Sequence, residues 1–297
     1  MTDSSWLWAV FTLVAAAAQT VRNATQRELT ASLGTAGATH VRFLFGLPFA
    51  LVFLLIVILA SGIALPRPSA IYWPWVLQGA LAQIVATALM LAAMSDRSFV
   101  VVYAYIKTEP VQVALFGLIL LGDPLTLPMM VAILIATTGV VLMALKPGTR
   151  LDVRATLLGI AAGSMFALSA VGYRGAILSL NLPSYLMAAT FTLAVGLVIQ
   201  CIVLSAWLWL REPGVLAAIG RHWRPSLLAG FLGALASQFW FLAFALATAA
   251  GVRTLALVEV LFAQAISSFV FKQVTTPREA IGIGLIVVGV AALLAAY

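Results

Sequence analysis

Two glutamates have the clearest capacity for chemistry in this sequence, because each lies inside a long apolar run: Glu109 and Glu259. An ionised side chain near the middle of a membrane costs about 2.5 kcal/mol or more unless it is paired, hydrated or protonated. Such a carboxyl group can bind the ammonium group of a solute. It can also carry a coupling proton, since desolvation favours its neutral form. The structural alternative is a glutamate that is hydrogen-bonded to a neighbouring helix.

The residues around Glu109 add polar groups and a helix breaker. Lys107 lies about 200° around the helix from Glu109, so it needs another partner, either an acid from another helix or a substrate carboxylate. Tyr105 and Gln112 lie about one turn to either side of Glu109, and the three form a polar stripe that suits a cavity wall. Pro110 has no amide hydrogen, so it predicts a kink beside Glu109 that serves as a hinge or shapes the packing.

Further polar groups lie within or at the ends of other apolar runs. An unsatisfied amide is costly there, so we expect these groups to line a cavity for substrate binding or coupling. They are Gln19, Asn23, Gln83, Tyr173, Gln238 and Trp240. Arg22 and Arg174 lie at similar depths, where they either snorkel to the interface or bind a ligand.

Catalytic and metal-binding patterns are missing from the sequence. His40 and His222 are its histidines, Cys201 is its single cysteine, and no His-Glu-x-x-His pattern occurs. A phosphate-binding Gly-x-x-x-x-Gly-Lys-Ser/Thr loop is also missing, so the chain has no ATPase of its own. We therefore predict no catalytic residue, no metal site, no cofactor and no enzyme. A channel or a membrane-embedded enzyme remains a remote alternative.

The composition indicates which elements must position these residues. The chain is 64% hydrophobic and 8% charged, against about 25% charged in globular proteins. One helical crossing of a bilayer needs about 20 apolar residues, so we predict an all-α integral membrane protein. Its net charge of +7 is typical of loops held at an anionic membrane face, and nucleic acid is not expected as a partner. The expected transmembrane helices are 5–26, 37–60, 73–95, 98–121, 126–145, 155–176, 184–209, 225–247, 250–271 and 278–296.

The stretch that begins near Lys107 matches the stretch that begins near Leu257, without gaps over tens of residues, at an offset of about 150 residues. The matched pairs include Glu109 with Glu259, Thr126 with Thr276, and Gly139 with Gly289. Each half then holds five helices, and an odd number inverts the second copy in the membrane. We predict two inverted five-helix repeats, residues 1–147 and 148–297. Many secondary transporters place their site between such halves and alternate access around it.

The sequence resembles the EamA-type, ten-helix members of the drug/metabolite transporter superfamily over nearly its whole length. The first-half residues that carry the resemblance are Arg42, Ala93, Ser98, Tyr103, Glu109-Pro110, Leu121-Gly122-Asp123, Leu125-Thr126 and Gly139-Val140-Val141. The second half departs from the pattern, with Val260 in place of the proline and Lys272-Gln273 in place of the Gly-acid pair. The resemblance implies substrate exchange through a central cavity.

These features together predict a secondary active transporter of a small amphiphilic metabolite, such as an amino acid, with export favoured and protons as one candidate coupling ion. The alternative is an uptake carrier or facilitator for organic cations or other small solutes. We expect a multi-pass protein of the cell (inner) membrane, monomeric or homodimeric, whose partners are its small-molecule substrate and the lipid bilayer. The Lys and Arg bias of the loops places both termini outside, whereas the resemblance places them inside.

Overall fold

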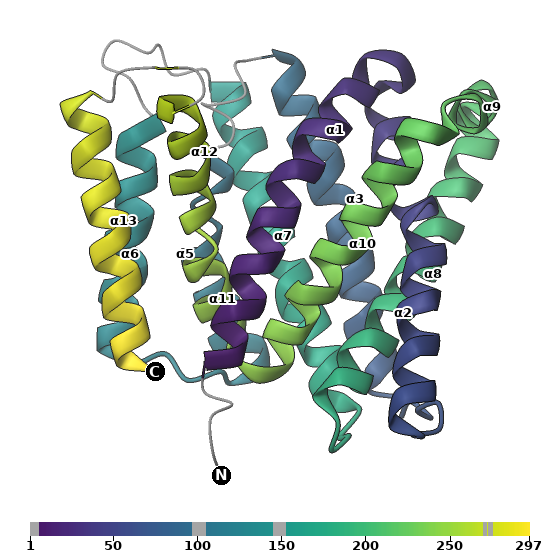
Figure 1. The fold of residues 1–297 in the computed structure, drawn as a ribbon, viewed down its shortest axis with the longest axis horizontal. Helices are drawn as coiled ribbons and strands as arrows, with labels where there is room; N and C mark the ends of the chain where they lie inside the picture. Colours follow the sequence, from purple (N-terminus) through teal and green to yellow (C-terminus); the bar gives the residue numbers. More distant parts are fainter. Residues whose placement is uncertain (1–5, 97–104, 145–152, 270–271, 273–275) are drawn as a thin grey trace. The chain divides into compact units, whose positions relative to one another are not determined.

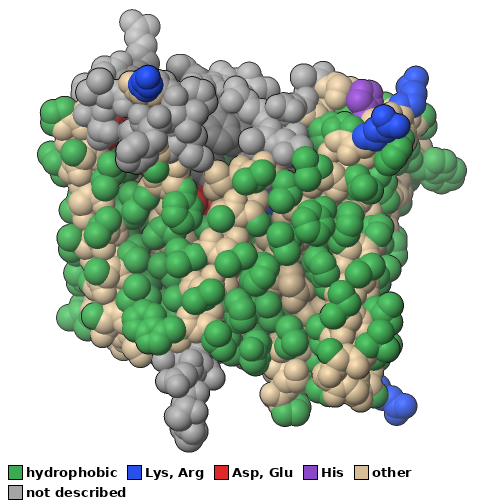
Figure 2. Space-filling view, viewed as in Figure 1, with side chains coloured by type: hydrophobic (Ala, Val, Ile, Leu, Met, Phe, Trp, Pro, Cys, Tyr) green, Lys and Arg blue, Asp and Glu red, His purple; other side chains and the backbone are tan. Residues whose placement is uncertain are grey.

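A computed structural model of the protein describes residues 6–96, 105–144, 153–269, 272 and 276–297, and its elements there are helices. Seven helices are long and apolar enough to cross a membrane by length and composition, and two shorter apolar helices span Leu7–Arg22 and Glu109–Leu121. Hydrophobic side chains cover the helices on the face shown in Figure 2, and Lys, Arg and His side chains lie mainly near helix ends. The prediction of an all-α membrane protein is confirmed.

Six of the expected spans agree with helices to within three residues at each end, whereas the expected span 98–121 lies partly outside the described residues and the expected span 250–271 is divided between two helices. The bounds of the helices are α1 Leu7–Leu44, α2 Gly46–Ser61, α3 Tyr72–Asp96, α5 Glu109–Phe116, the π-helix η2 Gly117–Leu121, α6 Leu127–Ala144, α7 Val153–Ser179, α8 Tyr185–Arg211, α9 Pro213–Arg221, α10 Trp223–Leu246, α11 Ala249–Leu255, α12 Val258–Phe269 and α13 Pro277–Ala296. The first predicted span and the beginning of the second are joined in α1, which is interrupted at Gly34 by φ 68° and ψ 179°, and the rest of the second forms α2. Glycine adopts this positive φ without steric cost.

The chain folds into two compact units. Unit 1 consists of Met1–Ile84 and Gly172–Leu246, and unit 2 consists of Val85–Val171 and Ala247–Tyr297. Helices α3 and α7 contribute to both units. Each unit therefore contains helices from both linear halves of the chain, while the repeat boundary at residue 147 remains a prediction.

Unit 1 is built around α10, which packs against α1, α2 and α8. Glycines allow the backbones of this unit to approach closely, as they do in many membrane proteins. A Cβ atom added to Gly172 of α7 would lie 2.6 Å from the amide nitrogen of Gly79 of α3. A Cβ atom added to Gly230 of α10 would lie 2.5 Å from the carbonyl carbon of Phe45. Neither position has room for a side chain.

Unit 2 contains the closely packed helices α6 and α13, which lie side by side (Figure 1). A Cβ atom added to Gly139 would lie 2.7 Å from the carbonyl oxygen of Gly282, and one added to Gly289 would lie 2.8 Å from that of Ala132. The later residue of α6 meets the earlier residue of α13, so the helices are antiparallel. Gly139 and Gly289 are matched at the predicted offset of about 150 residues, and so are Ala132 and Gly282. The two contacts are therefore counterparts of each other in the predicted repeat.

Helices α6 and α13 also begin alike. The hydroxyl of Thr126 accepts a hydrogen bond from the amide of Met129 at 3.4 Å. The hydroxyl of Thr276 accepts one from the amide of Glu279 at 3.3 Å, and the Glu279 carboxylate accepts one from the Thr276 amide at 2.7 Å. Both threonines thus satisfy amides that have no partner inside the helix.

Candidate functional site

The helix that carries Glu109 is interrupted beside it. Residues 105–106 are helical, Lys107 and Thr108 form a turn, and α5 begins at Glu109 with Pro110 in its first turn. Pro110 cannot donate to the carbonyl of Ile106, which a continuous helix would require. Within the turn, the amide of Thr108 donates a hydrogen bond to the carbonyl oxygen of Tyr105, three residues back, at 3.2 Å. The interruption that the proline predicts is present, and its role as a hinge stays a prediction.

The helix that carries Glu259 is interrupted at a corresponding place without a proline. Helix α11 ends at Leu255, a turn follows at 256–257, and α12 begins at Val258. The amide of Leu257 bonds the Thr254 carbonyl at 3.0 Å, a contact three residues back that tightens the helix locally. Both glutamates therefore lie in the first turn after a break.

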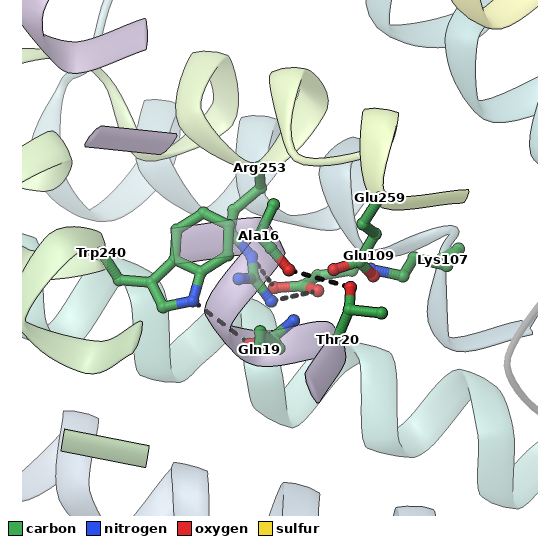
Figure 3. Close-up of polar contacts among 8 residues, drawn as sticks. All are labelled: Ala16, Gln19, Thr20, Lys107, Glu109, Trp240, Arg253 and Glu259. Atoms are coloured by element: carbon green, nitrogen blue, oxygen red, sulfur yellow. Dashed lines mark hydrogen bonds and ion pairs between the residues drawn. The ribbon is translucent and has the colours of Figure 1, made fainter. Parts of the chain in front are cut away.

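Two ion pairs join the two broken helices inside unit 2 (Figure 3). The Nε and Nη2 atoms of Arg253 donate to Oε1 and Oε2 of Glu109 at 2.6 and 2.7 Å, a bidentate arrangement. Lys107 forms an ion pair with Glu259. The four side chains are 12% exposed for Arg253, 3% for Glu109, 6% for Lys107 and 2% for Glu259. Each carboxylate is thus held by a cation from the other linear half.

This charge quartet, Lys107, Glu109, Arg253 and Glu259, has no net formal charge, which makes its burial tolerable. Of the two partners expected for Lys107, the structure shows the acid from another helix. The carboxylates are occupied by internal cations in this arrangement, so a solute ammonium or a proton would have to replace a cation. The sequence offers no means of choosing Arg253 as a partner, since it lies 144 residues from Glu109.

The predicted polar stripe around Glu109 is divided between two neighbouring helices. Glu109 faces α11, whereas Tyr105 and Gln112 lie against glycines of α7. A Cβ atom added to Gly159 would lie 2.7 Å from Cβ of Tyr105, and one added to Gly163 would lie 3.5 Å from Oε1 of Gln112. That amide oxygen is buried and accepts no hydrogen bond from the described residues.

Unit 1 brings two of the predicted polar residues together and adds one that the sequence reasoning missed. The amide nitrogen of Gln200, in α8, lies 2.7 Å from Oε1 of Gln83 and 3.0 Å from the hydroxyl of Tyr173. The Tyr173 hydroxyl in turn donates to Oε1 of Gln83 at 3.3 Å. The sequence feature that could have identified Gln200 is its amide side chain inside an apolar span. The cluster links α3, α7 and α8 by satisfied hydrogen bonds.

Gln19 of α1 and Trp240 of α10 are also brought together (Figure 3). The indole Nε1 donates to Oε1 of Gln19 at 3.2 Å, and the ring stacks on Phe244 with centroids 6.3 Å apart. Gln238 is used elsewhere, because its amide nitrogen donates to Thr190 of α8 at 2.7 Å. The side chain of Asn23 lies outside the described residues.

Replacing Trp240 with phenylalanine tests the contribution of this bond to stability. Trp240→Phe removes the donor but keeps a ring, so we expect a loss of about 1 kcal/mol. The midpoint of thermal unfolding in detergent should fall by roughly 2–4 °C. The matched control is Trp209→Phe, since Trp209 is 70% exposed. An unchanged midpoint for Trp240→Phe would show that the bond contributes nothing.

Of the two arginines expected to snorkel or to bind a ligand, Arg22 is buried and Arg174 is partly exposed. Arg22 is 4% exposed. Arg174 donates through Nη1 to the carbonyl oxygen of Phe244 at 2.6 Å, close to the last residue of α10. A cation at a helix C-terminus is favoured by the partial negative charge there. Arg174 therefore binds a helix end, and the burial of Arg22 disagrees with snorkelling of that side chain.

Comparisons with known proteins bear on the fold. No family model matches the chain, and no curated protein matches it. Among the solved structures, 26 chains match. One of them, described only as "Crystal structure of protein", matches with a TM-score of 0.73 and 16% sequence identity over 98% of this chain and 98% of its own. The chain shares its fold with that protein, and at this identity the likeness extends to the fold alone.

Proposed function

We propose that this protein is a secondary transporter of small solutes. The observation that carries the proposal is the pair of broken helices in unit 2, each with a buried glutamate bound by a cation of the other. Discontinuous membrane helices with such charges are typical of transporter substrate and coupling sites. Two buried ion pairs contribute little to the stability of a fold, because hydrophobic residues of similar volume often stabilise it equally well. Their presence therefore favours a role beyond stability.

We further propose ten transmembrane helices arranged as two inverted five-helix repeats. The reciprocal contacts of Gly139 with Gly282 and of Gly289 with Ala132 support this arrangement, because an antiparallel pair related by a two-fold axis must show them. The similar starts of α6 and α13 agree with it, as do the two breaks beside Glu109 and Glu259.

The proposed mechanism uses the charge quartet as an exchangeable set of ion pairs. A solute ammonium or a proton neutralises one glutamate, and the released cation then needs a new partner. The free energy of a buried unpaired charge drives the helices to a second arrangement. The breaks beside both glutamates supply backbone that can change its φ and ψ angles without unwinding an intact helix.

The solute class is proposed from the resemblance to EamA-type transporters and from the polar groups described above. We propose a small amphiphilic metabolite, such as an amino acid, that is exported across the cell (inner) membrane. An uptake carrier or a facilitator for organic cations would use the same ion pairs.

A solute screen tests the proposal. Thermal unfolding of the purified protein is measured with a panel of amino acids, amines and related metabolites, and exchange of each stabilising solute is then measured in proteoliposomes. We expect Glu109→Gln to lower the exchange rate by about tenfold, equivalent to about 1.4 kcal/mol, and to alter its pH dependence. If both properties stay as in the wild type, Glu109 has a structural role only.

A further inference from the structure

Helix α9 lies at one end of unit 1, between the last residue of α8 and the first residue of α10. Single residues connect it to these helices, Glu212 before it and His222 after it. It packs against α1, α8 and α10. Figure 1 shows α9 almost end-on, whereas α8 and α10 run along the plane of the picture, so α9 lies across the helices of its own unit. With 9 residues it is about 14 Å long, too short to cross a bilayer.

Helix α9 has an apolar side and an open side. Val215 and Ile219 are four residues apart and share one face, and Ile219 is 1% exposed. Val215 lies against α1, since a Cβ atom added to Gly37 would be 2.8 Å from its Cγ1 atom. Away from this face, a Cβ atom added to Gly214 or Gly220 would meet no described atom within 4 Å. One side of α9 therefore packs on unit 1, and no described residue covers the other.

Three exposed arginines lie around α9. Arg211 is the last residue of α8, Arg221 is the last residue of α9, and Arg224 lies in the first turn of α10. One exposed acid, Glu212, lies between them in the sequence, so positive charge predominates. In the space-filling view of Figure 2, Lys or Arg side chains and a histidine gather at the corner where Figure 1 places α9.

Helix electrostatics accounts for two of these arginines. Arg211 and Arg221 lie in the last turns of α8 and α9, where the partial negative charge of a helix C-terminus favours a cation. Arg224 lies at the opposite kind of helix end, where the same effect disfavours a cation. Its guanidinium group lies over the ring of Trp223, 5.4 Å from the centroid. The position of Arg224 therefore calls for negative charge from outside its helix.

Exposed tryptophans indicate the depth of α9 in the membrane. Trp207 and Trp209 lie near the end of α8 and are 44% and 70% exposed, and Trp223 begins α10 and is 50% exposed. Both α8 and α10 are long and apolar enough to cross a membrane. Tryptophans at the ends of such helices are typical of the boundary between hydrocarbon and headgroups. Helix α9 connects these two ends and thus lies at the level of the lipid headgroups.

We propose that α9, together with Arg211, Arg221 and Arg224, is a docking surface for the phosphate groups of anionic phospholipids. The planar guanidinium group binds phosphate through pairs of parallel hydrogen bonds. Short amphipathic helices with basic residues and flanking tryptophans are typical of segments that bind an anionic membrane surface. The occupant is a lipid because the tryptophans place the arginines at headgroup level. This assignment does not depend on the proposed transport function.

Binding of short-chain lipids tests the surface. The full chain in neutral detergent is titrated with short-chain phosphatidylglycerol or phosphatidylcholine, and bound lipid is counted by native mass spectrometry. We expect phosphatidylglycerol to bind more tightly than phosphatidylcholine. A basic residue near an anionic surface contributes about fivefold in affinity, so Arg221→Gln combined with Arg224→Gln should weaken phosphatidylglycerol binding by roughly 25-fold.

Arg67→Gln is the matched control for loss of an exposed arginine. Arg67 follows the span Ser32–Ser61, whose beginning lies beside α9 through the contact of Gly37 with Val215, so Arg67 lies at the opposite end of unit 1. This variant should bind phosphatidylglycerol as the wild type does. Arg221→Lys with Arg224→Lys keeps the charge but loses the planar fork, so its affinity should lie between those of the wild type and the glutamine variant.

The arginines are exposed, so all variants should unfold at the wild-type temperature in detergent alone, and a loss of lipid binding then reports on the surface. Equal phosphatidylglycerol affinity of the wild type and the glutamine variant would overturn the proposal. Equal binding of the two lipids by the wild type would do the same. If inorganic phosphate or a polyglutamate peptide displaces the lipid at equal concentration, the surface binds soluble anions or an acidic protein, and the lipid assignment is wrong.

Discussion

Replacing Arg253 with methionine should lower the stability of the protein by about 3–5 kcal/mol, because it leaves the carboxylate of Glu109 buried without its bidentate partner. Glu109 is 3% exposed and receives both hydrogen bonds from this one side chain. The midpoint of thermal unfolding should fall by roughly 10 °C. Differential scanning fluorimetry in detergent measures the change.

The double variant Arg253→Met with Glu109→Gln distinguishes two costs. One is the cost of leaving the Glu109 carboxylate buried and unpaired, and the other is the cost of losing the arginine side chain itself. Because the uncompensated charge is then removed, the double variant should recover much of the lost stability. Strictly additive losses would contradict the ion pair. Arg174→Met is the control for loss of an arginine side chain, since Arg174 donates to the carbonyl oxygen of Phe244.

Alanine at Gly289 should lower stability by about 1–3 kcal/mol, because the added methyl group meets backbone atoms that cannot move aside. Its Cβ atom would lie 2.6 Å from the amide nitrogen of Ala136. Gly139→Ala should cost a similar amount, since its Cβ atom would lie 2.7 Å from the Gly282 carbonyl oxygen. Losses of similar size at the two positions would agree with an inverted repeat.

The control lies in the same helix as Gly289. A Cβ atom added to Gly284 of α13 meets nothing within 4 Å, so Gly284→Ala should be neutral or stabilising by up to about 1 kcal/mol through better helix propensity. Chemical or thermal unfolding of the three variants measures the differences. A large loss for Gly284→Ala, or none for Gly289→Ala, would contradict the packing described for α6 and α13.

Local features of this protein could be predicted well from its sequence. Apolar runs of crossing length are a strong signal, and the helix at 185–211 follows the predicted span to within two residues. Pro110 indicated a break because its missing amide acts within one turn. Thr126 and Thr276 marked helix starts, because a threonine hydroxyl satisfies nearby amides.

Partners distant in the chain could not be predicted in the same way. The periodicity that places Lys107 and Glu109 on different faces says nothing about which helix lies opposite each. Arg253 therefore escaped notice as a partner of Glu109. No proline marks the break at 256–257. Gln200 is an amide inside an apolar span, and the sequence alone does not indicate that it lies beside Gln83 and Tyr173. Burial of Arg22 follows from the close approach of α1 to α10 at Gly233, which is a property of the packed helices.

Solute counterflow is the most direct test of a carrier built on the charge quartet. Proteoliposomes are loaded with a high concentration of unlabelled solute, diluted into a trace of the labelled solute, and followed over time. A carrier that alternates access predicts transient accumulation of label above its equilibrium level, with initial rates that saturate as the solute concentration rises. Arg253→Met should abolish the accumulation. Flux that never saturates and shows no transient accumulation would contradict the proposed carrier and indicate a channel.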